Sequence, residues 1–219
     1  MSFNSKSIEL SDNSAVPADV LVCATGWEPS LDFLSTEDRV RLGLPVRLSD
    51  EPPSHALRWR KLDASAQEKV VHLFPKLRDK PSSHELERTT SPYRLYRSIA
   101  PISREETILF LGCVQVGNNF MVAEAQALWA VAYLDRQLGL PATSEMEKEV
   151  AETVAWCRLR YPDRGHDGTF YYFDVVPYVD MLLQHVGLKS HRRSWPMGQM
   201  APMMAKDLGS LVQEYLVMR

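Results

Sequence analysis

Residues 165 to 174, Gly-His-Asp-Gly-Thr-Phe-Tyr-Tyr-Phe-Asp, gather groups that could transfer protons. His166 and Asp174 can act as acid or base when their surroundings tune their pKa values, and Tyr171 can hydrogen-bond a ligand. The two glycines permit a loop, and the rings offer an apolar surface for a hydrophobic small molecule. We therefore predict a catalytic set of His166, Asp174 and Tyr171, with Tyr172 as a substrate contact. The alternative, favoured by the usual role of aromatic side chains, is a surface turn followed by rings that pack in the core.

A second group of polar residues follows an apolar run at residues 107–112, which has the composition of a buried strand. Ligands of α/β sheets bind beyond the carboxyl ends of the strands. Gln115 and Asn118, together with Met121, are therefore predicted to bind the substrate. The alternative for Asn118 is to cap the helix that the sequence predicts from about residue 120.

Other kinds of chemistry find no support in the sequence. The six histidines form no H-E-x-x-H pattern, and no G-x-S-x-G is present, so neither a metal site nor a serine hydrolase is expected. The three cysteines, Cys23, Cys113 and Cys157, are far apart and are expected to be free thiols. A formal net charge of −3 gives no basic surface for nucleic acid.

The protein is expected to be cytoplasmic. The N-terminal residues contain no apolar stretch of the kind found in secretory signals. The longest apolar stretch, residues 120–138, is interrupted by charged residues, so no membrane span is expected.

The patterning predicts an α+β fold. Strands are expected at 6–10, 18–24 and 107–112, the last two buried as in a parallel sheet. Frequent prolines from residue 28 to residue 101 argue against long regular elements there, apart from a helix at 64–73. Further helices are expected at 120–138, at 144–160 after a capping box that starts at Ser144, at 177–186 and at 205–218.

Three segments resemble the C-terminal portion of flavin-containing monooxygenases, particularly the large fungal members. The first is Asp-Val-Leu-Val-Cys-Ala-Thr-Gly-Trp at 19–27. The second is Ile-Leu-Phe-Leu-Gly-Cys-Val-Gln at 108–115 with the Ala-rich stretch at 123–134. The third is Trp-Cys-Arg-Leu-Arg-Tyr-Pro at 156–162 with residues 178–188.

This resemblance implies a remnant of a Rossmann-like FAD-domain sheet formed by residues 1–30 and 105–140. A Pro-rich excursion would cover 31–104, and a helical region 141–219. If a flavin is bound, the resemblance places Ala24, Thr25, Gly26, Trp27 and Gly112 beside it. No G-x-G-x-x-G fingerprint for FAD or NADPH occurs in these 219 residues, so no cofactor is expected on the chain alone.

Three functions follow as hypotheses. The first is a cofactor-independent cyclase or isomerase of pericyclase type, acting on a hydrophobic small molecule of secondary metabolism, because orientation alone can accelerate such reactions. The second is a truncated or split monooxygenase that uses FAD and NADPH beside an FAD-bearing partner chain. The third is a non-catalytic binding remnant. An exposed sheet edge would favour a homodimer or the partner chain.

Overall fold

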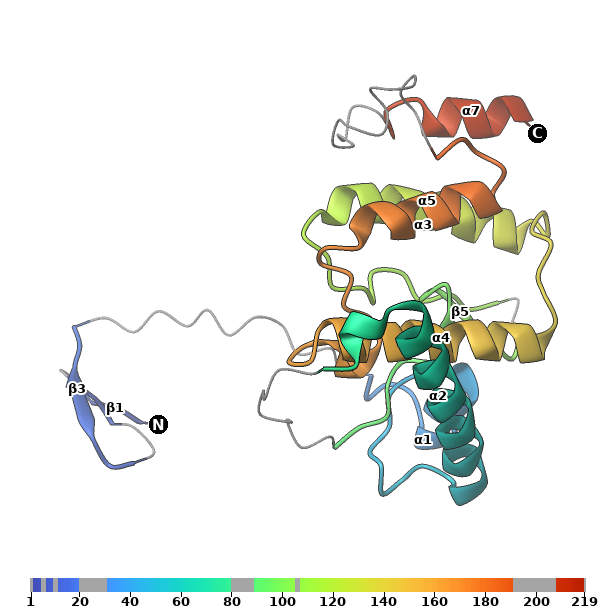
Figure 1. The fold of residues 1–219 in the computed structure, drawn as a ribbon. Helices are drawn as coiled ribbons and strands as arrows, with labels where there is room; N and C mark the ends of the chain where they lie inside the picture. Colours follow the sequence, from blue (N-terminus) through green and yellow to red (C-terminus); the bar gives the residue numbers. More distant parts are fainter. Residues whose placement is uncertain are drawn as a thin grey trace. The chain divides into compact units, whose positions relative to one another are not determined.

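The computed structural model describes residues 2–4, 7–9, 12–19, 31–79, 89–104, 107–190 and 208–218 (Figure 1). The chain divides into two compact units, Met1–Leu34 and Ser35–Arg219.

The first unit contains a small antiparallel sheet. β1 (Ser2–Asn4), β2 (Ser7–Glu9) and β3 (Ala15–Pro17) pair in that order. β2 confirms the strand expected at 6–10. Before β3 the chain turns where Asp12 Oδ1 accepts hydrogen bonds from the backbone N–H and hydroxyl of Ser14, at 3.0 and 2.6 Å. The strand expected at 18–24 lies, from residue 20 onward, outside the described residues.

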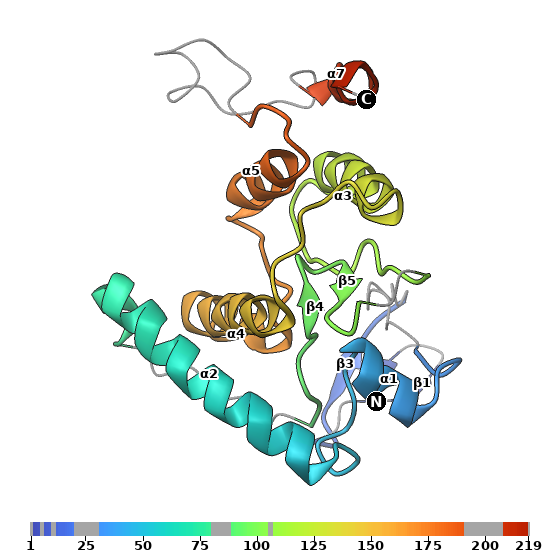
Figure 2. The ribbon, with the colours of Figure 1, turned by 90° about the vertical axis from the view of Figure 1, so that its right-hand side faces the viewer.

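The second unit is mainly helical (Figure 2). Its regular elements are α1 (Thr36–Leu42), α2 (Pro53–Leu73), η1 (Pro75–Leu77), β4 (Leu95–Tyr96), β5 (Ala100–Pro101), α3 (Asn119–Leu134), α4 (Thr143–Arg160), η2 (Gly165–Asp167), α5 (Val175–His185) and α7 (Leu211–Met218). α3 packs beside α5, and α2 packs across α4, while the short hairpin of β4 and β5 contacts α4.

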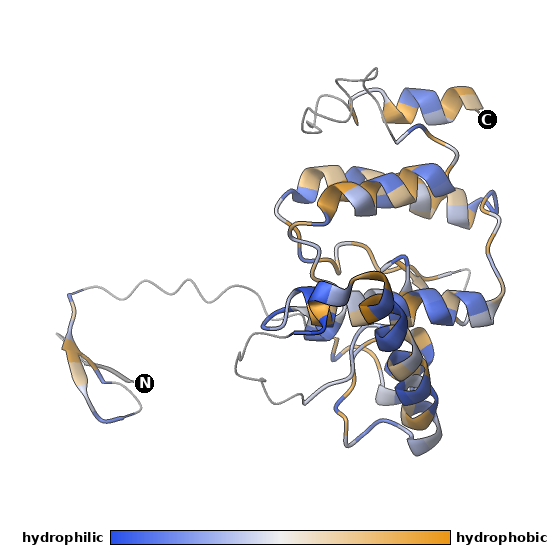
Figure 3. Ribbon diagram, in the orientation of Figure 1, coloured by the Kyte–Doolittle hydropathy of each residue, from blue (hydrophilic) through white to orange (hydrophobic). Residues whose placement is uncertain are grey.

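The core lies mainly between these helices. α3 is buried on most of its surface, and Trp129 and Ala125 are almost inaccessible. α2 buries a narrower stripe formed by Trp59, Ala66 and Val70. Hydrophobic and hydrophilic residues therefore alternate along the helices, as Figure 3 shows.

The prediction of a strand at 107–112 is wrong. These residues form no strand, because backbone N–H groups of this segment donate to a turn and to a side chain and not to a neighbouring strand. Phe110 N donates to Ile99 O at 2.9 Å, and Gly112 N donates to Oε1 of Gln126 at 2.9 Å. In the described residues the sheets are short and antiparallel. The α+β class therefore stands, whereas the remnant of a Rossmann-like sheet stays a prediction.

The expectation that residues 28–101 hold no long regular element is also wrong. α2 has 21 residues, of which the predicted helix at 64–73 is only the second half. The prolines lie where a helix tolerates them: Pro52 is the N-cap and Pro53 opens the first turn, where no intrahelical donor is lost. Proline therefore marks the start of this helix rather than interrupting it.

The remaining helices follow the predictions closely. α3, α4 and α5 are all present within a few residues of the expected bounds. The prediction that a capping box starts at Ser144 is wrong in position. The N-cap is Ala142, and its backbone N–H donates to Glu145 Oε2 at 3.1 Å. α7 confirms the last helix from Leu211, and its expected beginning at 205 falls outside the described residues.

Gly165 provides a test of the packing between α4 and the loop that follows it. A Cβ atom at this position would lie 1.8 Å from the carbonyl oxygen of Cys157, which α4 holds in place. We expect Gly165→Ala to lower the free energy of unfolding by about 1–3 kcal/mol, measured by urea denaturation. The control is Gly139→Ala, because a Cβ atom there meets no other atom within 4 Å. Equal losses for the two variants would contradict this account of the loop.

Candidate functional site

The structure brings the two predicted parts of the site together. Gln115 and Phe170 form a parallel bridge, in which Gln115 N donates to Thr169 O at 2.8 Å and Tyr171 N donates to Gln115 O at 2.9 Å. A Cβ atom on Gly117 would lie 3.5 Å from the ring of Tyr172. The segment after residue 112 and the loop at residues 165–174, here called the aromatic loop, therefore lie side by side.

Tyr171 belongs to the core. Its hydroxyl lies 3.1 Å from Ser98 Oγ, and its ring stacks on Tyr178 with the centroids 4.8 Å apart. Burial raises the pKa of Tyr171 well above its usual range, so the phenol stays protonated. In this arrangement Tyr171 links the aromatic loop to the turn between β4 and β5.

Asp174 is engaged by two neighbouring donors. Its Oδ2 accepts hydrogen bonds from Trp156 Nε1 at 2.9 Å and from the hydroxyl of Tyr161 at 2.7 Å. Burial, and then the hydrogen bond to Asp174, raise the pKa of Tyr161. The carboxylate thus fixes the end of the loop against α4.

His166 lies in η2, at the beginning of the loop. Its Nε2 is 3.0 Å from Asp167 Oδ1, and its backbone carbonyl accepts from Arg158 Nε at 3.4 Å. The polar contacts of His166 are therefore distinct from those of Tyr171 and Asp174. The geometry joins the three predicted catalytic residues through one loop and not through a shared hydrogen-bond chain.

The predicted ligand contacts also have roles within the fold. Asn118 Oδ1 accepts from Met121 N at 3.3 Å and so caps α3, and the side chain of Met121 is buried. Tyr172 is about half exposed. Gly112 has a φ of 76°, and a Cβ atom on it would meet nothing within 4 Å, so one side of this residue is open. Ala24, Thr25, Gly26 and Trp27 lie outside the described residues.

A buried polar chain that the sequence analysis missed lies behind the predicted site. Gln126, only 1% exposed, donates from Nε2 to the hydroxyl of Tyr178 at 2.7 Å, and that hydroxyl donates to Arg97 O at 2.8 Å. Burial raises the pKa of Tyr178. The signal in the sequence was the polar Gln126 between Ala125 and Ala127 in an Ala-rich helix.

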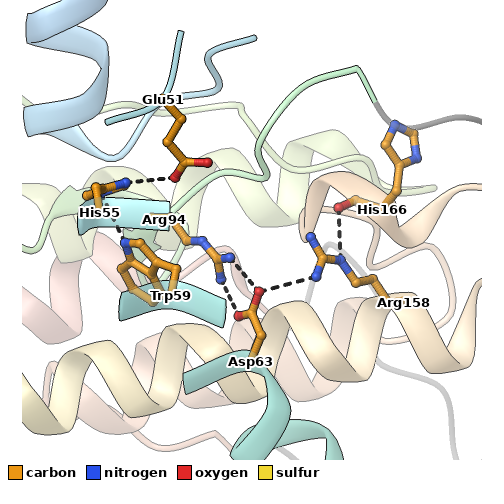
Figure 4. A network of polar contacts seen from close by, with 7 residues as sticks. All are labelled: Glu51, His55, Trp59, Asp63, Arg94, Arg158 and His166. Carbon is orange, nitrogen blue, oxygen red and sulfur yellow. Dashed lines mark hydrogen bonds and ion pairs between the residues drawn. The ribbon is translucent and has the colours of Figure 1, made fainter. Parts of the chain in front are cut away.

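A second network joins α2, α4 and the segment before β4 (Figure 4). Arg94 is buried, binds Asp63 through two 2.7 Å hydrogen bonds, and lies 4.2 Å above the centre of the Trp59 ring. Arg158 from α4 reaches the same carboxylate at 3.3 Å. Bidentate pairing of this kind fixes geometry as well as charge.

The same network continues to a histidine. Trp59 Nε1 donates to His55 Nε2 at 3.1 Å, and His55 Nδ1 lies 2.7 Å from Glu51 Oε1. A cleft of about 270 Å³ beside it is lined in part by Arg41, Arg58 and Arg94. Each of these guanidinium groups is paired with a carboxylate of this protein, which gives the network a structural role.

A third polar contact links α3 to α5 beside a cleft of about 380 Å³. Trp129 Nε1 donates to His185 Nδ1 at 3.0 Å, so the geometry assigns the proton of the neutral ring to Nε2. Burial, and then the charge of Arg97, lower the pKa of His185. The neutral ring is therefore the form that the fold stabilises.

No metal centre or membrane span is found within the described ranges. They contain no group of three or more His, Cys, Asp or Glu residues placed to hold a metal ion. None of the helices that the structure describes combines the length and apolarity needed to cross a bilayer.

Known proteins similar to this chain share one activity in their names. No protein-family model matches the chain, and no solved structure matches it. An FAD-dependent monooxygenase of Pyrenophora dematioidea is 38% identical over 192 residues, which cover 86% of this chain and 35% of that protein. The chain resembles part of an FAD-dependent monooxygenase. This finding confirms the resemblance inferred from the sequence.

Two relatives from Aspergillus agree with this match. FAD-dependent monooxygenases of Aspergillus nomiae and Aspergillus sclerotiorum are each 35% identical, over 98% and 91% of this chain. The matches cover 38% and 35% of those proteins. The chain thus spans little more than a third of the length of these curated relatives.

The contact between His185 and Trp129 predicts a dependence of stability on pH. The pKa of His185 is lower in the folded protein than its ordinary value of 6.5, so the unfolded chain binds the proton more readily. The stabilisation is complete above pH 6.5 and is lost as the pH falls through the folded-state pKa. We expect the difference in unfolding free energy between the wild type and His185→Gln to shrink from pH 7.5 to pH 5.5.

Urea denaturation at several pH values measures this difference. His72→Gln is the control, because His72 is exposed near the end of α2. A difference for His185→Gln that does not change with pH, or that matches the control, would contradict the assignment.

Proposed function

We propose that this chain forms part of an FAD-dependent monooxygenase and works together with segments that hold the FAD. The observation that carries the proposal is the match to three proteins of that name over 86–98% of this chain, against 35–38% of their length. FAD, when bound, supplies the redox chemistry.

The described residues suit contact with one edge of a flavin. The open side of Gly112 allows a flavin to approach the backbone closely, because glycine has no Cβ atom. Asn118 lies at the start of α3, whose N-terminal end favours a partial negative charge. Tyr172 packs beside Gly117 and would help to exclude water from this region.

The cofactor-independent cyclase or isomerase is the weaker proposal. Its predicted catalytic residues are engaged within the fold: Tyr171 with Ser98, and Asp174 with Trp156 and Tyr161. His166 has separate contacts. A binding remnant without catalysis is the third proposal.

The test is a chimera in which this chain replaces the matching stretch of the Pyrenophora dematioidea monooxygenase. We expect the purified, desalted chimera to retain FAD in near-stoichiometric amount, because the replaced part is similar along almost its whole length. Absorbance in the flavin bands measures the retained cofactor. The controls are the intact relative and a version from which the matching stretch is deleted.

A colourless chimera beside a yellow intact relative would contradict the proposal. Equal FAD retention by the deletion control would do so as well, since this chain would then contribute nothing to the flavin site. Conversion of a substrate by the isolated chain without FAD would favour the cyclase or isomerase.

A further inference from the structure

Six aromatic side chains in the helical unit form two sets of contacting rings that are both tied to Asp174, and together they are here called the aromatic face. Phe74 meets Trp156 with the ring centroids 4.9 Å apart. The other four rings form a closed set of contacts, with centroid separations between 4.9 and 6.2 Å. The members of the face are Phe74, Trp156, Tyr161, Phe170, Tyr172 and Phe173.

The inner part of the aromatic face is held rigidly. Asp174 accepts hydrogen bonds from both Trp156 and Tyr161, which fixes these two rings on α4 and just beyond it. Phe173 stacks on Tyr161, and Phe173 N donates to the Tyr161 hydroxyl at 3.3 Å. Side chains that are already ordered lose little conformational entropy when another body binds.

The outer part of the face is accessible. Phe173 is 72% exposed, Tyr172 is 52% exposed and Phe74 is 48% exposed. Aromatic residues are enriched at protein interfaces, and contiguous apolar patches of this kind mark interaction sites. The ring contacts, together with the two hydrogen bonds to Asp174, show that these residues are clustered and are not scattered singly.

We infer that the aromatic face packs against the FAD-bearing body of the monooxygenase, an inference that rests on the proposed function. The shared stretch is 35% and 38% of these two relatives, so more than half of each relative lies outside it. The face also adjoins the segment proposed to approach the flavin, through the contact between Tyr172 and Gly117. A body that contacts Gly112 and Asn118 would therefore meet the aromatic face as well.

The size of the face favours a covalently linked partner over a second copy. The three exposed rings offer on the order of 300–400 Å², given about 150–250 Å² for each whole aromatic side chain. A stable association of free proteins needs about 800 Å² from each partner. A body on the same chain needs less, because the linkage raises its effective concentration.

Thiol labelling in the chimera tests whether the face is covered. Phe173→Cys places a thiol in the set of four rings, and Phe74→Cys places a second thiol in the pair formed with Trp156. We expect each to react at least about tenfold more slowly in the FAD-loaded chimera than in the isolated chain, because a docked face must open before the thiol can react. Val217→Cys is the control, since Val217 is 87% exposed on α7.

The native cysteines contribute little background at the two described positions. Burial raises the pKa of Cys113 to about 11 and that of Cys157 to about 12, which lowers the fraction of reactive thiolate. The rate measured for each parent protein without an added cysteine is subtracted.

The outcomes separate the inference from the proposed function. Equal labelling at Phe173→Cys and Phe74→Cys in the isolated chain and a yellow chimera would overturn the inference and leave the proposed function standing. A colourless chimera would overturn both. Protection in the isolated chain that increases with protein concentration would assign the face to a second copy and overturn the inference.

Discussion

The helical unit depends on the buried hydrogen-bond chain that runs through Gln126 and Tyr178. Gln126 accepts from Gly112 N and donates to Tyr178, which in turn donates to Arg97 O. One connected set of polar groups thereby joins α3, α5, the turn after β4 and the segment before α3. A buried polar network is favourable only when each group finds its partner, so these four parts must take one arrangement together.

This constraint determines what the chain offers to other molecules. Tyr171 stacks on Tyr178 and belongs to the same core, while Asp174 holds the aromatic loop on α4. The groups that could have catalysed a reaction alone thus hold the fold in place. What remains on the outside is an ordered aromatic surface beside the open side of Gly112. Such a surface is suited to association, in keeping with a chain that matches about a third of longer monooxygenases.

The sequence predicted the helices well because their signals are local. Periodic apolar residues and the Asn118 cap place α3 correctly without knowledge of its neighbours. Residues 107–112 were mistaken for a strand because a short apolar run carries no information about its hydrogen-bond partners, and here the partner is the side chain of Gln126. The proximity of Gln115 to the aromatic loop could be anticipated. The partners of Tyr171 and Asp174 could not, since they come from segments distant in the chain.

The central claim is that the chain carries a structural and docking role while the flavin is held mainly by other segments. Titration of FAD into the isolated, folded chain, followed by the quenching of flavin fluorescence, tests it most directly. The account predicts no saturable quenching, because these 219 residues contain no glycine-rich fingerprint for the pyrophosphate. Saturable binding of one FAD per chain would contradict the claim and would make this chain a flavoprotein by itself.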